Sequence, residues 1–330
     1  MKKIFFLVVF LSVFFLSGCD KYDEKSIKKD LNDKYSNLKS YYITGDLEIY
    51  NGDNTYKYSV ESSYYDNNYR VSLVNKNNNH EQIILRNDDG VYVLTPSLNK
   101  TFKFQSNWPE KSSQVYLIES FINDLNNDEN MKLVEKDKEF VIESKLAYSN
   151  NKNLAKEKIY LDKDLNISKI EVYDDDNHLQ MKMTFKDIDL KSTFNNSYFS
   201  VDENMKSDNS ETLETISEIE DAIYPMYLPS GTYLSSEETV SKTDGERIIL
   251  SFSGESPFII VQETISTSEE SDIIPVSGEP EFITDTLGAV SGSSIDFISN
   301  GIEYYISSDS LTKEEMIQVA ESISPVAVMK

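Results

Sequence analysis

The chain has 330 residues, of which 57 are acidic and 32 basic, so its formal net charge at pH 7 is −25. Such an acidic chain repels nucleic acid and anionic membrane surfaces, which excludes nucleic-acid binding. Its single cysteine, Cys19, excludes an intrachain disulfide and the zinc and redox motifs that need several cysteines.

The first eighteen residues have the layout of a bacterial secretory signal. Two lysines precede an apolar stretch from Ile4 to Leu16, which is too short to span a bilayer. Leucine, two small residues and then Cys19 resemble the bacterial lipobox, and the resemblance implies a diacylglyceryl group and acyl chains such as palmitate on Cys19, which becomes the first residue after cleavage. The alternative is an ordinary signal peptide or an uncleaved anchor helix.

This leader predicts a lipid-anchored protein on the extracytoplasmic face of the cell membrane. The abundance of Asn, Lys, Ile and Tyr is typical of a low-GC, Gram-positive source, where the spore inner membrane or the forespore envelope are further locations. Because the chain is acidic, the acyl chains must hold it at the membrane without help from charge.

Alternating strands dominate the part after the leader. Apolar residues at helical spacing predict an amphipathic helix just after Cys19, and a second helix over residues 113–125. Strands with turns at Asn51-Gly52 and Asp88 to Gly90 lie between the two helices, and further strands continue to residue 190. We therefore expect residues 19–204 to form a curved antiparallel sheet, a half-open β-barrel over helices. It either encloses an apolar cavity or is filled by its own helices.

The rest of the chain reads as a second unit. Residues 205–223 are expected to be a linker or helix entry, and residues 224–330 a smaller, acidic α+β domain. From Val201 to Lys330 there are 26 acidic and 5 basic residues. Asn300-Gly301 predicts a hairpin, residues 266–280 an acidic loop, and Ser310 or Thr312 the cap of a final helix.

The block from Asp89 to Leu125, "DGVYVLTPSLNKTFKFQSNWPEKSSQVYLIESFINDL", resembles LolA-type lipoproteins of spore-forming Gram-positive bacteria, including sporulation and germination lipoproteins of the GerS kind. The wider layout is similar to the LolA/LolB/RseB superfamily. This resemblance implies an α+β fold and a non-enzymatic scaffold that acts in sporulation or germination through a cell-wall (cortex) amidase or another envelope partner. Alternatives are a lipid or lipoprotein carrier with an apolar cavity, and an RseB-like sensor regulating an anti-sigma factor.

Aromatic and apolar residues of this block are the candidate site. They either pack in the core or line a cavity mouth for an acyl chain or glycan, or a partner surface. The candidate residues are Tyr92, Leu94, Phe102, Phe104, Trp108 and Tyr116.

The chain contains partial matches to catalytic and metal-binding motifs, but the neighbouring residues argue against each of them. Ser97 opens an S-x-x-K motif and residues 207–209 read S-D-N, as in penicillin-interacting enzymes, but Ser97 follows a proline between strands rather than opening a helix. The loop at Asp162 lacks the glycine and the last carboxylate of a calcium site. His80 and His178 lie far apart in polar turns. We therefore predict no catalytic residue, metal or cofactor.

An unclosed sheet has open edges, and these suggest how the protein makes contacts. Unpaired backbone groups at an edge can accept a strand from a partner or from a second copy. A strand-mediated homodimer is thus a further expectation.

Overall fold

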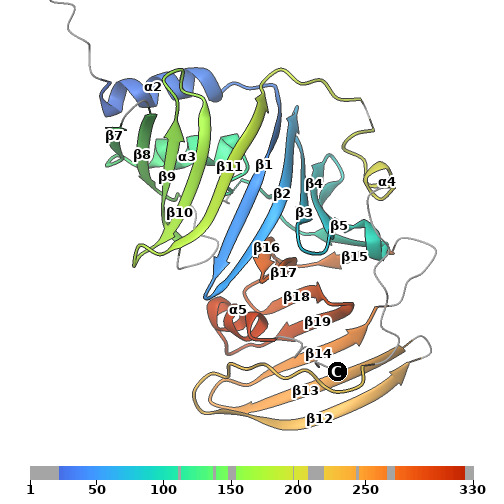
Figure 1. Cartoon of the computed structure of the whole chain (residues 1–330). Helices are drawn as coiled ribbons and strands as arrows, with labels where there is room; N and C mark the ends of the chain where they lie inside the picture. Colours follow the sequence, from blue (N-terminus) through green and yellow to red (C-terminus); the bar gives the residue numbers. More distant parts are fainter. Residues whose placement is uncertain are drawn as a thin grey trace, which may run out of the picture.

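The computed structural model describes residues 22–110, 113–136, 139–147, 154–195, 197–206, 219–242, 245–265 and 272–323. A large curved sheet lies above a smaller one, with two helices on one side of the large sheet (Figure 1). Within these ranges no helix is both long and apolar enough to cross a membrane. Cys19, the predicted leader 1–18 and most of the predicted linker 205–223 lie outside the described residues.

Twelve strands form the large sheet, in the order β15-β6-β5-β4-β3-β2-β1-β11-β10-β9-β8-β7. Neighbours are antiparallel except for β15 and β6, and the two end strands do not pair with each other, so the barrel stays open. The strands are β1 (Ser40–Asn51), β2 (Asn54–Tyr65), β3 (Asn68–Asn75), β4 (Glu81–Asn87), β5 (Gly90–Thr95), β6 (Lys100–Phe104), β7 (Lys132–Lys136), β8 (Glu139–Lys145), β9 (Leu154–Leu161), β10 (Ile167–Asp174), β11 (Leu179–Asp189) and β15 (Asp272–Val276).

A bulge in the centre of the sheet contributes to its curvature. The register between β1 and β11 shifts between Thr44 and Gly45, and such a bulge bends the strand and increases its twist. A Cβ atom on Gly45 would lie 2.5 Å from the carbonyl oxygen of Thr184, so the close approach of the two strands requires glycine here.

The concave face of the large sheet is filled by α2 (Glu24–Tyr35) and α3 (Ile118–Asn127). Apolar side chains of both helices, among them Leu31 and Leu125, are buried in one cluster with the inward side chains of the strands. The rings of Tyr35 and Phe121 meet edge-on, with 5.6 Å between their centroids. The side chain of Asp23 caps the first helix by accepting a hydrogen bond from the Ser26 N–H at 2.7 Å.

Seven strands form the smaller sheet, in the order β12-β13-β14-β19-β18-β17-β16, and α5 (Lys313–Glu321) packs on one face of it. Thr312 and Glu315 form a capping box at the start of α5. Two short helices, η1 (Pro96–Leu98) and α4 (Val201–Asn204), complete the described elements. The strands are β12 (Thr232–Lys242), β13 (Gly245–Gly254), β14 (Phe258–Thr264), β16 (Glu279–Ile283), β17 (Thr286–Val290), β18 (Ser294–Ser299) and β19 (Ile302–Ser307).

The two sheets are joined through buried contacts. The side chain of Gln82 in β4 accepts hydrogen bonds from the Leu287 N–H at 2.7 Å and the Thr286 hydroxyl at 3.1 Å. Leu287 and Ala289 also belong to the main apolar cluster of the large sheet. The smaller sheet therefore adds to the core of the large one, and the division into units 19–204 and 224–330 stays a prediction.

The predicted fold class, a curved antiparallel half-barrel over helices followed by a smaller α+β unit, is confirmed. The predicted acidic loop at 266–280 is wrong where it is described, because β15 and the start of β16 lie there. Pro275 explains why the sequence did not predict β15, because proline usually argues against a strand. An edge strand tolerates proline, since one side of the strand needs no hydrogen-bond donors.

We expect Gln82→Met to cost about 1–3 kcal/mol of unfolding free energy, because it leaves the buried Leu287 N–H without its acceptor. Urea denaturation measures the loss. Gln105→Met, at an exposed position, is the control and should change stability by less than about 0.5 kcal/mol. Equal stabilities of the two variants would show that this junction contributes little.

Candidate functional site

The six candidate residues belong to two separate apolar clusters, one on each side of the large sheet. Tyr92 and Leu94 pack on the outer face against Phe199. The remaining four, Phe102, Phe104, Trp108 and Tyr116, belong to the main core on the inner face. All six are buried and they do not surround one opening. They act as packing residues here, and a role in binding stays a prediction.

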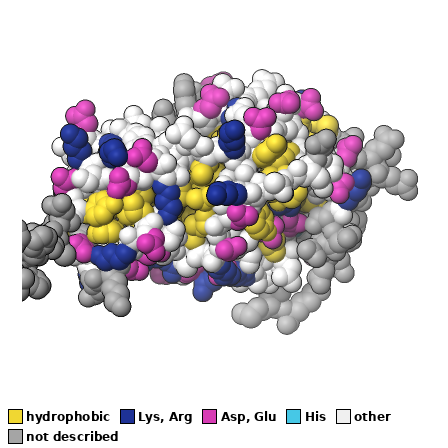
Figure 2. Space-filling view, turned by 90° about the horizontal axis from the view of Figure 1, so that it is seen from above, with side chains coloured by type: hydrophobic (Ala, Val, Ile, Leu, Met, Phe, Trp, Pro, Cys, Tyr) yellow, Lys and Arg dark blue, Asp and Glu magenta, His cyan; other side chains and the backbone are white. Residues whose placement is uncertain are grey.

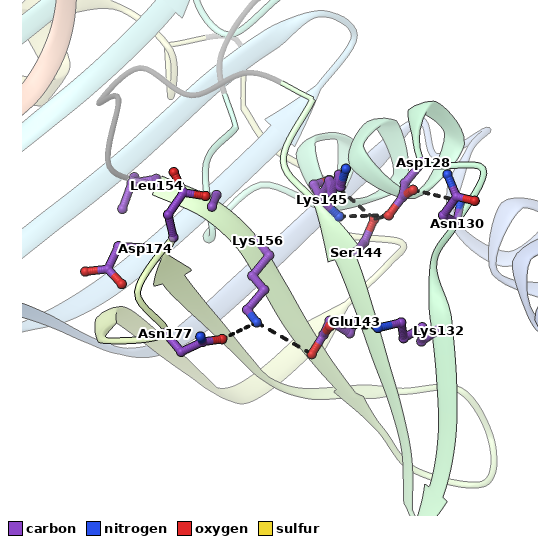
Figure 3. A pocket seen from close by; sticks show the side chains of 12 residues that line it. Asp128, Asn130, Lys132, Glu143, Ser144, Lys145, Leu154, Lys156, Asp174 and Asn177 are labelled. Carbon is purple, nitrogen blue, oxygen red and sulfur yellow. Dashed lines mark hydrogen bonds and ion pairs between the residues drawn. The ribbon is translucent and has the colours of Figure 1, made fainter.

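An open groove of about 610 Å³ lies where β8, β9 and β10 meet the end of α3. Figure 3 shows side chains of both charges converging on it from several strands. Ten of its twelve lining residues have polar or charged side chains, an arrangement that suits a hydrated ligand or a protein surface. The lining residues are Asp128, Asn130, Lys132, Glu143, Ser144, Lys145, Leu154, Ala155, Lys156, Asp174, Asp175 and Asn177.

Charges inside the groove neutralise one another. The carboxylate of Glu143 has the ammonium groups of Lys132 and Lys158 at 3.9 Å and that of Lys156 at 4.0 Å. Lys156 also donates to the side chain of Asn177, so it connects Glu143 of β8 with the turn between β10 and β11 (Figure 3). Such partly exposed pairs contribute roughly 0–1 kcal/mol each, so a ligand can exchange them at little cost.

Two acidic side chains are buried behind the groove. Asp124 of α3 accepts hydrogen bonds from the Ser113 hydroxyl at 2.8 Å and the Ala147 N–H at 2.7 Å, and burial raises its pKa to about 6. Glu157 of β9 is only 2% exposed, and its Oε1 has no hydrogen-bond partner. Burial, with a smaller contribution from the charge of Asp124, raises the pKa of Glu157 well above its usual value.

We expect Glu157→Gln to become more stable relative to the wild type as the pH rises. Below the pKa of the unfolded chain both states hold the proton. Above that pKa, Glu157 ionises in the unfolded chain but stays protonated in the folded one. The wild type then loses up to about 1.4 kcal/mol of unfolding free energy for each unit by which the folded pKa exceeds the unfolded pKa. Denaturation between pH 4 and pH 8 measures this. Glu139→Gln, at an exposed site on neighbouring β8, should show no such trend, and a pH-independent difference for Glu157→Gln would contradict the assignment.

A smaller pocket of about 240 Å³ lies between α3 and the end of the sheet where β3 begins and β4 ends. Figure 2 looks down on the top of the molecule, where hydrophobic side chains lie in separate patches between charged ones. Tyr69 and Arg86 form one wall of the pocket, and the Nη1 of Arg86 donates to the Trp108 carbonyl at 3.1 Å. Opposite them, Glu119 accepts from the Tyr41 hydroxyl at 2.9 Å, and burial raises its pKa. Arg86 and Glu119 therefore already have hydrogen-bond partners outside the pocket lining.

The structure brings Ser97 and His80 together, with the hydroxyl 3.0 Å from Nδ1. This is the spacing of a nucleophile and its base, but Ser97 is buried in η1 and burial lowers the pKa of His80. No group of three or more His, Cys, Asp or Glu side chains suited to a metal ion occurs among the described residues. The Asp162 loop is a hairpin turn held by hydrogen bonds from Asp164 and Asn166.

Sequence reasoning missed the buried acids. Asp124 interrupts the apolar face of α3 between Ile122 and Leu125, and Glu157 shares the inward face of β9 with Ile159. An acidic residue in phase with buried neighbours is the signal that could have found both.

The chain belongs to the YdcC-like family of sporulation proteins, whose model matches residues 1–199. Sporulation protein YdcC of Bacillus subtilis (strain 168) is 36% identical to it over 329 residues, which cover 98% of this chain and 97% of that protein. The expected membership of a sporulation-protein family is thereby confirmed.

Solved structures show looser likenesses. The Pseudomonas aeruginosa MucA/MucB complex matches 91% of this chain and 99% of its own, with 11% identity and a TM-score of 0.34. A LolA superfamily protein from Nitrosomonas europaea matches 56% of this chain and 100% of its own, with 14% identity and a TM-score of 0.32.

Proposed function

We propose that this protein is a lipid-anchored, extracytoplasmic scaffold that acts in sporulation by binding another envelope protein and performs no catalysis itself. Membership of a sporulation-protein family supports the process. The observation that supports binding over carriage is the filled concave face of the large sheet, where Leu31, Phe121 and Leu125 occupy the space that an acyl chain would need.

The hollows that remain favour a protein partner. The large groove is open and lined mainly by polar and charged residues, and Arg86 and Glu119 of the smaller pocket already have hydrogen-bond partners. Both sheets also end in strands that pair on one side only within the described chain. Open edges and polar grooves are surfaces that proteins use to bind other proteins.

A cell-wall amidase is the partner that we propose, on the basis of the resemblance to GerS-type lipoproteins. Two or more acyl chains on Cys19 would keep this scaffold at the membrane almost permanently. A permanent anchor suits a protein that holds an enzyme near its substrate, and it does not suit a shuttling carrier.

We expect the purified, delipidated protein to show no saturable binding of a fluorescent fatty acid, since its concave face is packed. Phe121→Ala should open a cavity, cost about 3–5 kcal/mol of stability and permit weak probe binding if the fold survives. Val134→Ala, at an exposed site on β7, is the control. Saturable binding by the wild type would favour the carrier over the scaffold.

The anchor itself is tested at Cys19. Intact-mass analysis of detergent-extracted protein should find acyl chains on Cys19 and the first eighteen residues removed, and cells fed an alkyne fatty acid should label the protein. Cys19→Ala should lose the label, whereas Ser17→Ala, which keeps a small residue before the cysteine, should retain it. An unmodified thiol in the wild type would rule out the lipid anchor.

A further inference from the structure

A segment of residues 219–229, called the crossing segment below, runs over one face of the smaller sheet. Ile219 is buried in the core of that sheet, and Ile223 packs against it. The side chain of Gln262 in β14 accepts from the Ile223 N–H at 2.9 Å and donates to its carbonyl oxygen. The N–H of Met226 donates to the Ser322 carbonyl at 3.2 Å, just after α5. The segment is therefore held in place at several points.

Apolar side chains of this held segment nevertheless point to solvent. Met226 is 82% exposed and Tyr224 is 47% exposed, and Tyr227 and Leu228 are also exposed. Tyr233 and Leu234, at the start of β12, bring the number of exposed apolar side chains to six within eleven positions. Single exposed apolar residues are normal, but a dense group of them on an ordered segment marks a contact surface.

The crossing segment adjoins an open strand edge. β12 is the last strand of its sheet and pairs only with β13 among the described residues. The Tyr224 hydroxyl donates to the carboxylate of Glu237 in β12, which joins the apolar group to this edge. After a register shift between Leu234 and Ser236, the strand runs regularly to Lys242, so its outer side offers backbone groups to another strand.

Charge at this edge is strongly negative. Residues 219–265 contain eight acidic and two basic side chains. Both basic side chains, Lys242 and Arg247, already contact Glu263. Glu237 and Glu238, which point to opposite faces of β12, thus present negative charge on both sides of the open edge.

We propose that the crossing segment and the edge of β12 form one docking surface for an extended segment of a partner protein in which basic and apolar residues alternate. The apolar side chains would contact Met226 and Tyr227 on the face of the crossing segment, and the basic ones would face Glu238 on the opposite face. A second copy fits poorly, because antiparallel self-pairing centred on this strand sets glutamate opposite glutamate. An anionic membrane is repelled for the same reason. This proposal rests on the proposed binding function and assigns its surface.

The test uses the full mature chain and an eight-residue peptide of alternating lysine and valine, capped at both ends. Calorimetry should detect binding that weakens as salt is added, and hydrogen exchange should slow within residues 232–242. We expect Met226→Ser/Tyr227→Ser and Glu237→Gln/Glu238→Gln each to weaken binding about tenfold, as loss of central contacts does. A peptide of equal charge with N-methyl groups at alternate positions cannot donate to the edge and should bind at least about tenfold more weakly.

Matched variants control for general attraction to an acidic protein. Asp88→Asn/Asp89→Asn removes two adjacent charges from an exposed turn of the large sheet, and Val134→Ser removes an exposed apolar side chain from β7. Both should bind the peptide within about twofold of the wild type. Equal weakening by Asp88→Asn/Asp89→Asn, an unaffected N-methylated peptide, or absence of binding would overturn the proposal.

Binding of the purified amidase separates this proposal from the proposed function. If the amidase binds the wild type and also the Glu237→Gln/Glu238→Gln and Met226→Ser/Tyr227→Ser variants with equal affinity, the scaffold function stands and the docking surface is wrong. If the amidase does not bind the wild type but the peptide behaves as expected, the surface stands and this partner is wrong.

Discussion

Burial of the apolar faces of α2 and α3 against the concave side of the large sheet is the interaction on which the rest of the structure depends. A sheet of this size that is curved but unclosed exposes an apolar inner face, and here the chain covers it with its own helices. The core is thereby completed internally. The surfaces available for binding other molecules are therefore the grooves and the open edges of the sheets.

Three desolvated acids lie where α3 meets the large sheet. Glu119 near one end of the helix and Asp124 near the other are both desolvated, and Glu157 lies on the strand face nearby. The smaller sheet also contains buried acids, because burial raises the pKa of Glu281 and of Asp296 to about 7, whereas Glu237 and Glu238 on β12 are exposed. Buried acids make the fold sensitive to pH, whereas surface acids determine which partners approach.

Local features were predictable from sequence, and distant pairings were not. The Asn51-Gly52 and Asn300-Gly301 hairpins and the amphipathic helices follow from turn chemistry and periodicity, and the structure contains them all. The hydrogen bonds that Gln82 accepts from Thr286 and Leu287 of β17 join residues about two hundred positions apart, so no local sequence pattern predicts them. Of the candidate site, sequence reasoning identified a well-packed block but neither the groove nor the crossing segment. Both of these depend on how separate strands come together.

The strand β15 makes the large sheet depend on the C-terminal part of the chain. The family model matches residues 1–199, a stretch that holds eleven of the twelve strands of the large sheet. The twelfth strand comes from residues 272–276 and lies parallel to β6. A fragment ending near residue 199 would therefore lack the strand that pairs with β6 and the C-terminal side chains, such as Leu287 and Ala289, that complete the main apolar core.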